Sequence, residues 1–280
     1  MCRLILAHGS FAAADIAAAA VQMSCGATAD HDNATTVHAH GWGAVWRDPV
    51  DGGLRVHRDV RPAADSLLAS PVAHVRTDFL AIHVRNATLP GNRGLTFTHP
   101  LERPEDDWYF MHNGYLPTVY ELLGMSESVF DSAEYFDYLI PPRTAGLEQA
   151  SALARLRAIP PGGMSGNAIA VHPDRAHLVH WSPPGTRTPV FFAMHRHTTA
   201  DRLVVASEIV ADLAPAEHWD PLPADTVLTF PFTREGARPG AREAAREGAR
   251  ERTPSCPLPG SASSTTSTGP QTRRPTAPAS

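Results

Sequence analysis

Apolar residues fall into short runs and amphipathic stretches that predict a mixture of strands and helices. Predicted strands cover residues 2–8, 40–47, 79–85, 108–112, 167–172, 176–181, 190–195 and 202–207. Predicted helices cover residues 12–23, 62–69, 132–140 and 147–159. The last four strands follow one another without a helix between them, which favours antiparallel sheets over parallel βαβ units. The pattern therefore predicts an α+β fold.

Two positions refine this pattern. Gly41 and Gly43 interrupt the strand at 40–47, which predicts that other atoms approach its backbone closely. Asp131 is the predicted N-cap of the helix at 132–140, and two prolines at 141 and 142 end that helix.

Composition changes sharply after Phe232. We expect one domain over 1–232 and a disordered tail over 233–280 that is rich in Arg, Pro and Ser and has little to bury. The tail has an arginine at every fourth position over a stretch of its length, a spacing that in a helix would give a basic stripe for nucleic acid. The positions are Arg234, Arg238, Arg242, Arg246 and Arg250. Pro and Gly between them disfavour a helix, so we expect no nucleic-acid partner.

The bulk composition excludes several classes of protein. The chain has 280 residues, a hydrophobic fraction of 42% and a formal charge of −5, which suits a globular protein. No apolar run is long enough to span a bilayer, so we expect no membrane association. Its three cysteines cannot all pair, which favours a reducing compartment and a cytoplasmic location.

The second residue, Cys2, is the strongest candidate for chemistry. A methionine followed by a small residue is a substrate for removal, and Cys2 would then carry a thiol and a free α-amino group together. An α-amino group has a pKa of about 7.7–8.0 and a cysteine thiol about 8.5. The amine can therefore act as base for the thiol at neutral pH. The alternative is that Cys2 is a small buried hydrophobe at the start of a strand.

Three further segments carry polar residues at element ends. Arg85 and Thr88 follow a predicted strand and suit a carboxylate, which a guanidinium binds with paired donors. Asp131 suits an ammonium group. Asn113 and Gly114 can supply an amide N–H and a backbone N–H to a developing oxyanion. Each also has a structural interpretation, as a surface ion pair, a helix cap or a hairpin turn.

These segments in this order resemble the class II glutamine amidotransferase domain of the N-terminal-nucleophile (Ntn) hydrolases, over roughly residues 2–230. The resemblance is carried by the Met-Cys start and by the motifs at 41–43, 83–88, 99–100, 110–114, 131–132 and 206–208. It is greatest to stand-alone members, including the amidohydrolase of ergothioneine biosynthesis. It implies a four-layer α/β/β/α sandwich of two antiparallel sheets, and no cofactor.

The resemblance also implies residue roles. Cys2 would be nucleophile and base, and Asn113 and Gly114 would form the oxyanion hole. Glutamine would be bound by Arg85, Thr88 and Asp131. We assign no catalytic role to His8, His83 and His112, which lie beside these motifs, because the α-amine makes a histidine base unnecessary.

The chain departs from the family pattern after three of these motifs. Arg3 follows Cys2 where many members have glycine, and Glu134 lies one place later than the usual glutamate. Leu89-Pro90 follow Thr88 where members often have His-Gly. The segment 86–98 is the expected lid over the substrate, with Gly91 and Gly94 as hinges.

We therefore expect an amidohydrolase that cleaves the linear side-chain amide of glutamine or a γ-glutamyl amide through a Cys2 thioester. Alternatives are an ammonia-donating subunit for a separate synthase, a glutamine-binding pseudoenzyme, and an N-terminal-cysteine acylase for penicillin- or bile-salt-like amides. A metal-binding protein is a further alternative, because His38 and His40, and His195 and His197, form i, i+2 pairs. No third and fourth ligand follows at a suitable spacing, so we expect no metal.

Overall fold

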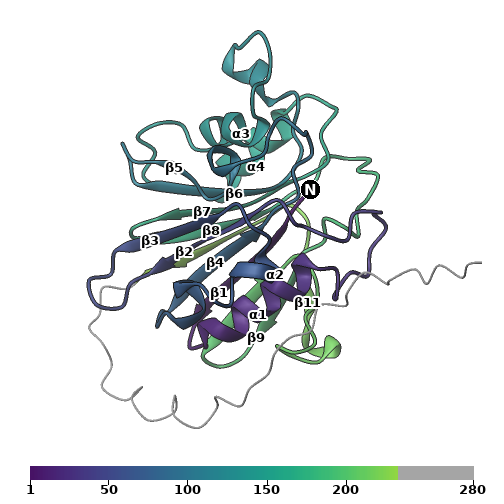
Figure 1. Ribbon diagram of the computed structural model, residues 1–280. Helices are drawn as coiled ribbons and strands as arrows, with labels where there is room; N and C mark the ends of the chain where they lie inside the picture. The colour runs from purple at the N-terminus through teal and green to yellow at the C-terminus, as the bar shows by residue number, and fades with distance from the viewer. Residues whose placement is uncertain (233–280) are drawn as a thin grey trace, which may run out of the picture.

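Two antiparallel sheets lie face to face, with helices over both outer faces (Figure 1). The computed structural model describes residues 1–232. The seven-stranded sheet has the order β11-β9-β10-β1-β4-β2-β3, and the five-stranded sheet has the order β12-β8-β7-β6-β5. This arrangement confirms the predicted four-layer α/β/β/α sandwich.

The strands of the larger sheet are β1 (Arg3–Gly9), β2 (Trp42–Arg47), β3 (Leu54–Asp59), β4 (Phe79–Val84), β9 (His195–Thr198), β10 (Arg202–Ala206) and β11 (Asp220–Pro221). Those of the smaller sheet are β5 (Leu101–Arg103), β6 (Trp108–Gly114), β7 (Gly166–His172), β8 (Arg175–His180) and β12 (Thr226–Pro231). The α-helices are α1 (Ala13–Ser24), α2 (Ala63–Ser66), α3 (Asp131–Leu139) and α4 (Gln149–Ala158). Short 3₁₀ helices are η1 (Pro71–His74), η2 (Leu95–Phe97), η3 (Val119–Leu123) and η4 (Ala216–His218).

Side-chain alternation along the central strands builds three separate apolar layers. On β1, Ile5 and Ala7 face the α1 side, whereas Leu4 and Leu6 face the second sheet. The same alternation on β6 sends Phe110 toward α3 and α4 and Met111 between the sheets. Because successive strand residues point to opposite faces, a strand buried on both sides is apolar almost throughout.

The strand pairing brings the predicted site segments to one end of the sandwich. β1 pairs antiparallel with β4, with Arg3 opposite Val84. Cys2, just before β1, and Arg85, just after β4, therefore lie beside each other at one end of these central strands. Asn113 and Gly114 end β6 in the facing sheet, opposite Asn167 and Gly166. The closed sandwich therefore places residues from both sheets around the N-terminus, which Figure 1 shows at the sheet ends.

Close backbone approach explains Gly43 in β2 and Gly41 just before it. A Cβ at Gly43 would lie 2.0 Å from the carbonyl oxygen of His99. A Cβ at Gly41, where φ is +101°, would lie 2.7 Å from the carbonyl oxygen of Asp59. The expected close approach is confirmed at both positions, since neither leaves space for a side chain.

One predicted strand is wrong. Residues 190–192 form a turn and 193–194 have no regular structure, so that β9 begins only at His195. Phe191 and Phe192 are both buried and pack edge to face against each other, with their ring centroids 5.0 Å apart. Their apolar side chains, and not a strand, produced the signal.

Other expectations differ in extent or fall outside the structure. The helix predicted at 62–69 is shortened to the four residues of α2. Strands β3, β5, β11 and β12 were not predicted. The predicted tail, 233–280, lies outside the described residues. Within residues 1–232, no helix has the length and apolar character needed to cross a bilayer.

Candidate active site

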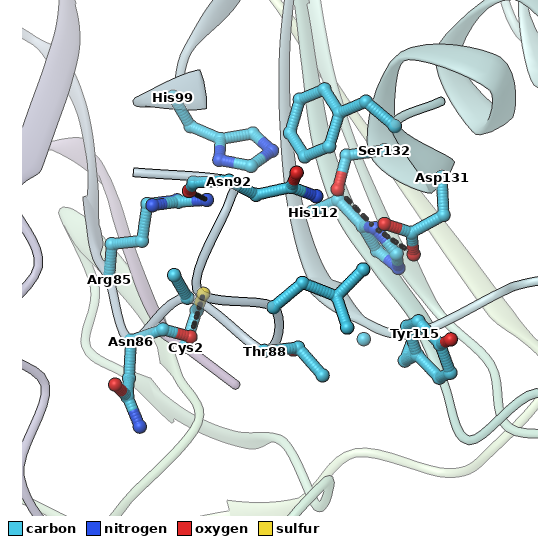
Figure 2. A pocket seen from close by; sticks show the side chains of 14 residues that line it. Cys2, Arg85, Asn86, Thr88, Asn92, His99, His112, Tyr115, Asp131 and Ser132 are labelled. Carbon is cyan, nitrogen blue, oxygen red and sulfur yellow. Dashed lines mark hydrogen bonds and ion pairs between the residues drawn. The ribbon is translucent and has the colours of Figure 1, made fainter. Parts of the chain in front are cut away.

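Cys2 lies at the start of β1, 8% exposed, where the two sheets meet. Met1 is present in the structure, so the Cys2 nitrogen is a peptide N–H, and it donates to Asn113 Oδ1 at 3.1 Å. The Cys2 Sγ lies 3.9 Å from the carbonyl oxygen of Asn86 (Figure 2). The nucleophile predicted from the sequence is thus fixed between two elements of the predicted site.

The surroundings of Cys2 favour the thiolate. Burial raises the pKa of the Cys2 thiol, but the charge of His83, the N-terminal ammonium, a hydrogen bond with His83 and the charge of Arg85 act against it. Together they lower that pKa from 9.0 to about 6. A thiolate is the reactive form of cysteine, so the site increases the fraction of nucleophile at neutral pH.

Asn113 presents an unused donor beside Cys2. It is fully buried, and its Nδ2 has no hydrogen-bond partner among the described residues. Met111 and Asn113 share the face of β6 that points between the sheets, because strand side chains alternate. This alternation aims the Asn113 amide at Cys2.

Gly114 ends β6 where no side chain fits. A Cβ there would lie 1.8 Å from the carbonyl oxygen of Ser165 and 2.4 Å from His112 Nε2. The position therefore requires glycine, and the backbone of Gly114 borders the pocket directly.

Arg85 follows β4 and is 3% exposed. Its Nη2 donates to the carbonyl oxygen of Asn92, while Nη1 is buried and has no partner among the described residues. Burial lowers the pKa of Arg85, and the nearby Cys2 and Asp131 oppose that shift. The free Nη1 leaves the guanidinium able to bind an anion in the pocket.

Asp131 is the first residue of α3 and not its N-cap, which is Phe130. One carboxylate oxygen accepts the Leu116 N–H at 2.9 Å, which holds the side chain toward the pocket instead of over its own helix. Glu134 secures the preceding turn, since its Oε1 accepts the N–H groups of Val129 at 2.6 Å and Phe130 at 2.9 Å. The prediction that Asp131 is the N-cap was wrong. The Asp131 carboxylate is bound to the Leu116 N–H, and the turn before the helix is held by Glu134 instead.

Thr88 lies at the pocket rim and is exposed. The ammonium group of Met1 lies 3.5 Å from Thr88 Oγ1 and donates to the carbonyl oxygen of Asn86. The Met1 ammonium therefore contacts two polar groups at the rim, the Asn86 carbonyl oxygen and the hydroxyl of Thr88, which is a predicted substrate ligand.

One pocket collects Cys2, Arg85, Thr88, Gly114 and Asp131. Figure 2 shows Arg85 and Asp131 on opposite sides of this pocket. Asn113 is not among the lining residues, although its Oδ1 accepts the N–H of Cys2, which does line the pocket. The cavity has a volume of about 30 Å³, which is enough for one or two water molecules. Any larger substrate requires the surrounding segments to move.

Four further lining residues belong to the segment expected as a lid, namely Asn86, Ala87, Leu89 and Asn92. The pocket also contains residues to which the sequence analysis gave no role: His99, His112, Tyr115, Phe130 and Ser132. His112 lies 3.0 Å from Ser132 Oγ through Nδ1 and 3.1 Å from the Ser165 carbonyl oxygen through Nε2. It thereby links β6 to the start of α3. His112 is two residues after Phe110, so strand alternation places both side chains on the face of β6 that is covered by α3. The sequence pattern could therefore have located His112 on this face.

His99 differs because neither ring nitrogen has a partner among residues 1–232. Its ring packs 4.3 Å from that of His83, and burial together with the charges of His83 and Arg85 holds its pKa well below the usual range. A neutral ring beside Arg85 adds polarity to the pocket without charge. The sequence supplied only the dipeptide His99-Pro100, which does not specify this position.

The paired histidines are engaged in hydrogen bonds. His38 Nδ1 lies 3.0 Å from the Met1 carbonyl oxygen, and His197 Nδ1 lies 3.0 Å from that of His218. Within residues 1–232, no group of three or more His, Cys, Asp or Glu side chains is arranged to hold a metal ion.

Comparison with known proteins shows a resemblance to one family. Residues 1–132 of the 280-residue chain match the family model for class-II glutamine amidotransferases. The chain resembles this family over that part of its length. The match spans Cys2, Arg85, Asn113, Gly114 and Asp131, the positions assembled around the pocket. No curated protein matches the chain significantly.

Solved structures show the same fold at low sequence identity. Glutamine phosphoribosylpyrophosphate amidotransferase from B. subtilis aligns with a TM-score of 0.55 and 15% identity, over 84% of this chain and 50% of that one. An allosteric regulatory enzyme of purine biosynthesis gives 0.55 and 16%, over 84% and 50%. A glutamine aminotransferase class-II domain protein from Silicibacter pomeroyi gives 0.51 and 18%, over 81% and 94%. The chain thus spans half the length of the first two enzymes and nearly all of the third.

Proposed function

We propose that this protein is a class-II amidotransferase that hydrolyses the side-chain amide of glutamine, or a γ-glutamyl amide, through a thioester on Cys2. The observation that carries the proposal is the Cys2 contact with Asn113, with Arg85 and Asp131 in the same pocket. Nucleophile, oxyanion donor and charged head-group ligands are then within one site.

The chemistry begins with loss of Met1, which turns the Cys2 amide nitrogen into an α-amino group. The amine accepts the thiol proton, and the sulfur attacks the carboxamide carbon. Asn113 Nδ2 and the Gly114 N–H stabilise the resulting oxyanion. The carbon–nitrogen bond breaks, and the departing ammonia or amine takes the proton from the α-ammonium. Water then cleaves the thioester, which releases glutamate and restores the thiol.

The charged residues of the pocket favour an amino-acid head group. Arg85, with Nη1 free, would bind the α-carboxylate, and Thr88 would add a hydroxyl at the rim. Asp131 would accept the α-ammonium group. An acylase for penicillin- or bile-salt-like amides would not require Arg85, Thr88 and Asp131 to converge on an amino-acid head group, so their presence in one pocket favours a glutamyl substrate.

A second candidate is an ammonia donor for a separate synthase. The chain aligns with only half of the B. subtilis amidotransferase, so a partner chain could supply the remaining part. The two candidates share the Cys2 chemistry and differ in the fate of ammonia.

The decisive experiment combines mass spectrometry with a product assay. We expect the intact mass to lack Met1, and 6-diazo-5-oxonorleucine to label Cys2 in the wild type but not in Cys2→Ala. Incubation with glutamine should yield glutamate and ammonia. A protein that loses Met1 yet shows neither labelling nor turnover would refute the hydrolase. Binding of glutamine without turnover would instead indicate the pseudoenzyme, and turnover of γ-glutamyl amides alone would refute ammonia donation.

A further inference from the structure

His38 contacts the residue that maturation removes. Its ring is fully buried, and Nδ1 lies 3.0 Å from the Met1 carbonyl oxygen. The backbone around it is held on both sides, since the His38 N–H donates to Ser24 at 2.7 Å and the His40 N–H donates to Arg85 at 2.8 Å. The ring therefore has a fixed position beside the N-terminus.

Loss of Met1 changes what this ring faces. The carbonyl oxygen that contacts Nδ1 leaves, and the Cys2 nitrogen two bonds away becomes a free α-amino group. Nε2 of His38 is already without a partner among the described residues, so after maturation neither ring nitrogen would be bonded. Buried polar groups without partners are costly, which favours a new bond from Nδ1 to the amine, directly or through one water.

The ring is neutral. Burial and the charge of Arg3 lower the pKa of His38 from 6.5 to about 3, against the hydrogen bond with Met1, which raises it. Nδ1 carries the ring proton while it faces the Met1 carbonyl oxygen, because that oxygen can only accept. Once the carbonyl has left, the neutral ring can hold its proton on Nε2, and Nδ1 can then accept an N–H from the α-amine. A charged ring would instead repel the ammonium form.

The amine has two N–H groups and one lone pair. Asn113 Oδ1 already accepts one N–H from the Cys2 nitrogen at 3.1 Å. If a second acceptor takes the other N–H, the lone pair is left for the thiol proton. We propose that His38 is this second acceptor, a positioning residue that orients the Cys2 α-amino group after Met1 removal. The inference rests on the proposed function above.

The test compares His38→Asn, His38→Gln and His38→Phe. An asparagine amide reaches the position of Nδ1, a glutamine amide reaches that of Nε2, and phenylalanine fills the space without a polar atom. Glutamine hydrolysis is measured for each, with kcat normalised to the fraction of chains that lack Met1 by intact mass. His74→Gln, at an exposed position of η1, is the control.

We expect kcat to fall about 100-fold in His38→Gln and His38→Phe, as for a misplaced catalytic group. The KM for glutamine should stay unchanged, because His38 does not line the pocket. His38→Asn should recover most of kcat. Wild-type kcat in the Gln and Phe variants would overturn the inference, and so would equal loss in all three with lowered thermal unfolding midpoints. A wild type that lacks Met1 but neither turns over nor labels at Cys2 would refute the proposed function itself.

Discussion

Asn113 joins the two halves of the candidate site through a single side chain. Its Oδ1 accepts the Cys2 N–H, its Nδ2 has no hydrogen-bond partner within residues 1–232, and Asn167 lies opposite it on β7. Asn167 uses its own amide differently, with Oδ1 bonded to Trp181 and Nδ2 to Phe192. The two asparagines therefore differ in their contacts: Asn113 binds Cys2 beside the pocket, whereas Asn167 binds backbone groups in the protein interior.

Asn113→Ala should remove the oxyanion donor. We expect kcat for glutamine hydrolysis to fall about 100- to 1,000-fold with little change in KM. Asn167→Ala is the contrasting variant, and should lower the thermal unfolding midpoint while the folded fraction keeps its kcat. Steady-state kinetics and thermal unfolding separate the two, and an active Asn113→Ala enzyme would remove Asn113 from the mechanism.

The reactivity of Cys2 should depend on His83. In the chain that retains Met1, the pKa of Cys2 is lowered to about 6, so its thiolate predominates above that pH. Alkylation of this form by iodoacetamide should rise through about pH 6 and then level off. His83 is the strongest of the lowering influences, so His83→Gln should move the midpoint to higher pH. The exposed His74→Gln should not move it. An unchanged midpoint in His83→Gln would show that other groups stabilise the thiolate.

We propose that the segment 86–98 controls access to the pocket, which several of its residues line. It begins beside Arg85, whose Nη2 donates to the carbonyl oxygen of Asn92. A Cβ added at Gly91 or Gly94 would have no atom of the described part of the chain within 4 Å. They differ in backbone, since Gly94 has φ 99° and ψ 176°, a conformation that only glycine adopts readily.

Gly94→Ala and Gly91→Ala form a matched pair for this segment. Alanine at 94 adds about 1–3 kcal/mol of backbone strain, which the segment relieves by leaving its present position. We expect a higher KM for glutamine and faster proteolysis within 86–98 in Gly94→Ala, and neither in Gly91→Ala. Equal behaviour of the two variants would exclude a role for the Gly94 conformation.

The sandwich as a whole is closed by the end of the described chain. β12 pairs with β8, and the Phe232 ring packs 4.9 Å from that of Phe79, between the sheets. Phe230 belongs to the same inter-sheet cluster. We propose that residues 1–232 form the complete catalytic domain, since both sheets and the pocket are built from them.

Truncation tests this boundary. A chain ending at residue 232 should keep the glutaminase activity and unfolding midpoint of the full protein. A chain ending at residue 229 loses Phe230 and Phe232, and truncation of one buried Phe alone costs about 3–5 kcal/mol. It should unfold at lower denaturant concentration. A fall in stability for the longer truncated chain would place the boundary beyond residue 232.

The sequence was sufficient for local elements and for the types of residue in the site. Apolar runs located β1, β4 and β6 to within a few residues, because a strand buried on both faces must be apolar throughout. It also selected Cys2, Arg85, Thr88, Asn113, Gly114 and Asp131. It failed at 190–195, where two buried phenylalanines imitate a strand, and at β12, whose turn-flanked residues gave no distinct pattern.

Spatial convergence was decided by the tertiary structure alone. Only antiparallel pairing of β1 with β4, and packing of the second sheet over it, brings Asn113 to Cys2 and His38 to Met1. The lowered pKa of Cys2 likewise depends on His83 and Arg85, which are remote in sequence. The sequence determines which reactive and charged side chains the protein contains. Their distances, burial and free hydrogen-bond donors arise when the sheets pack, because those properties belong to neighbours that the sequence does not place side by side.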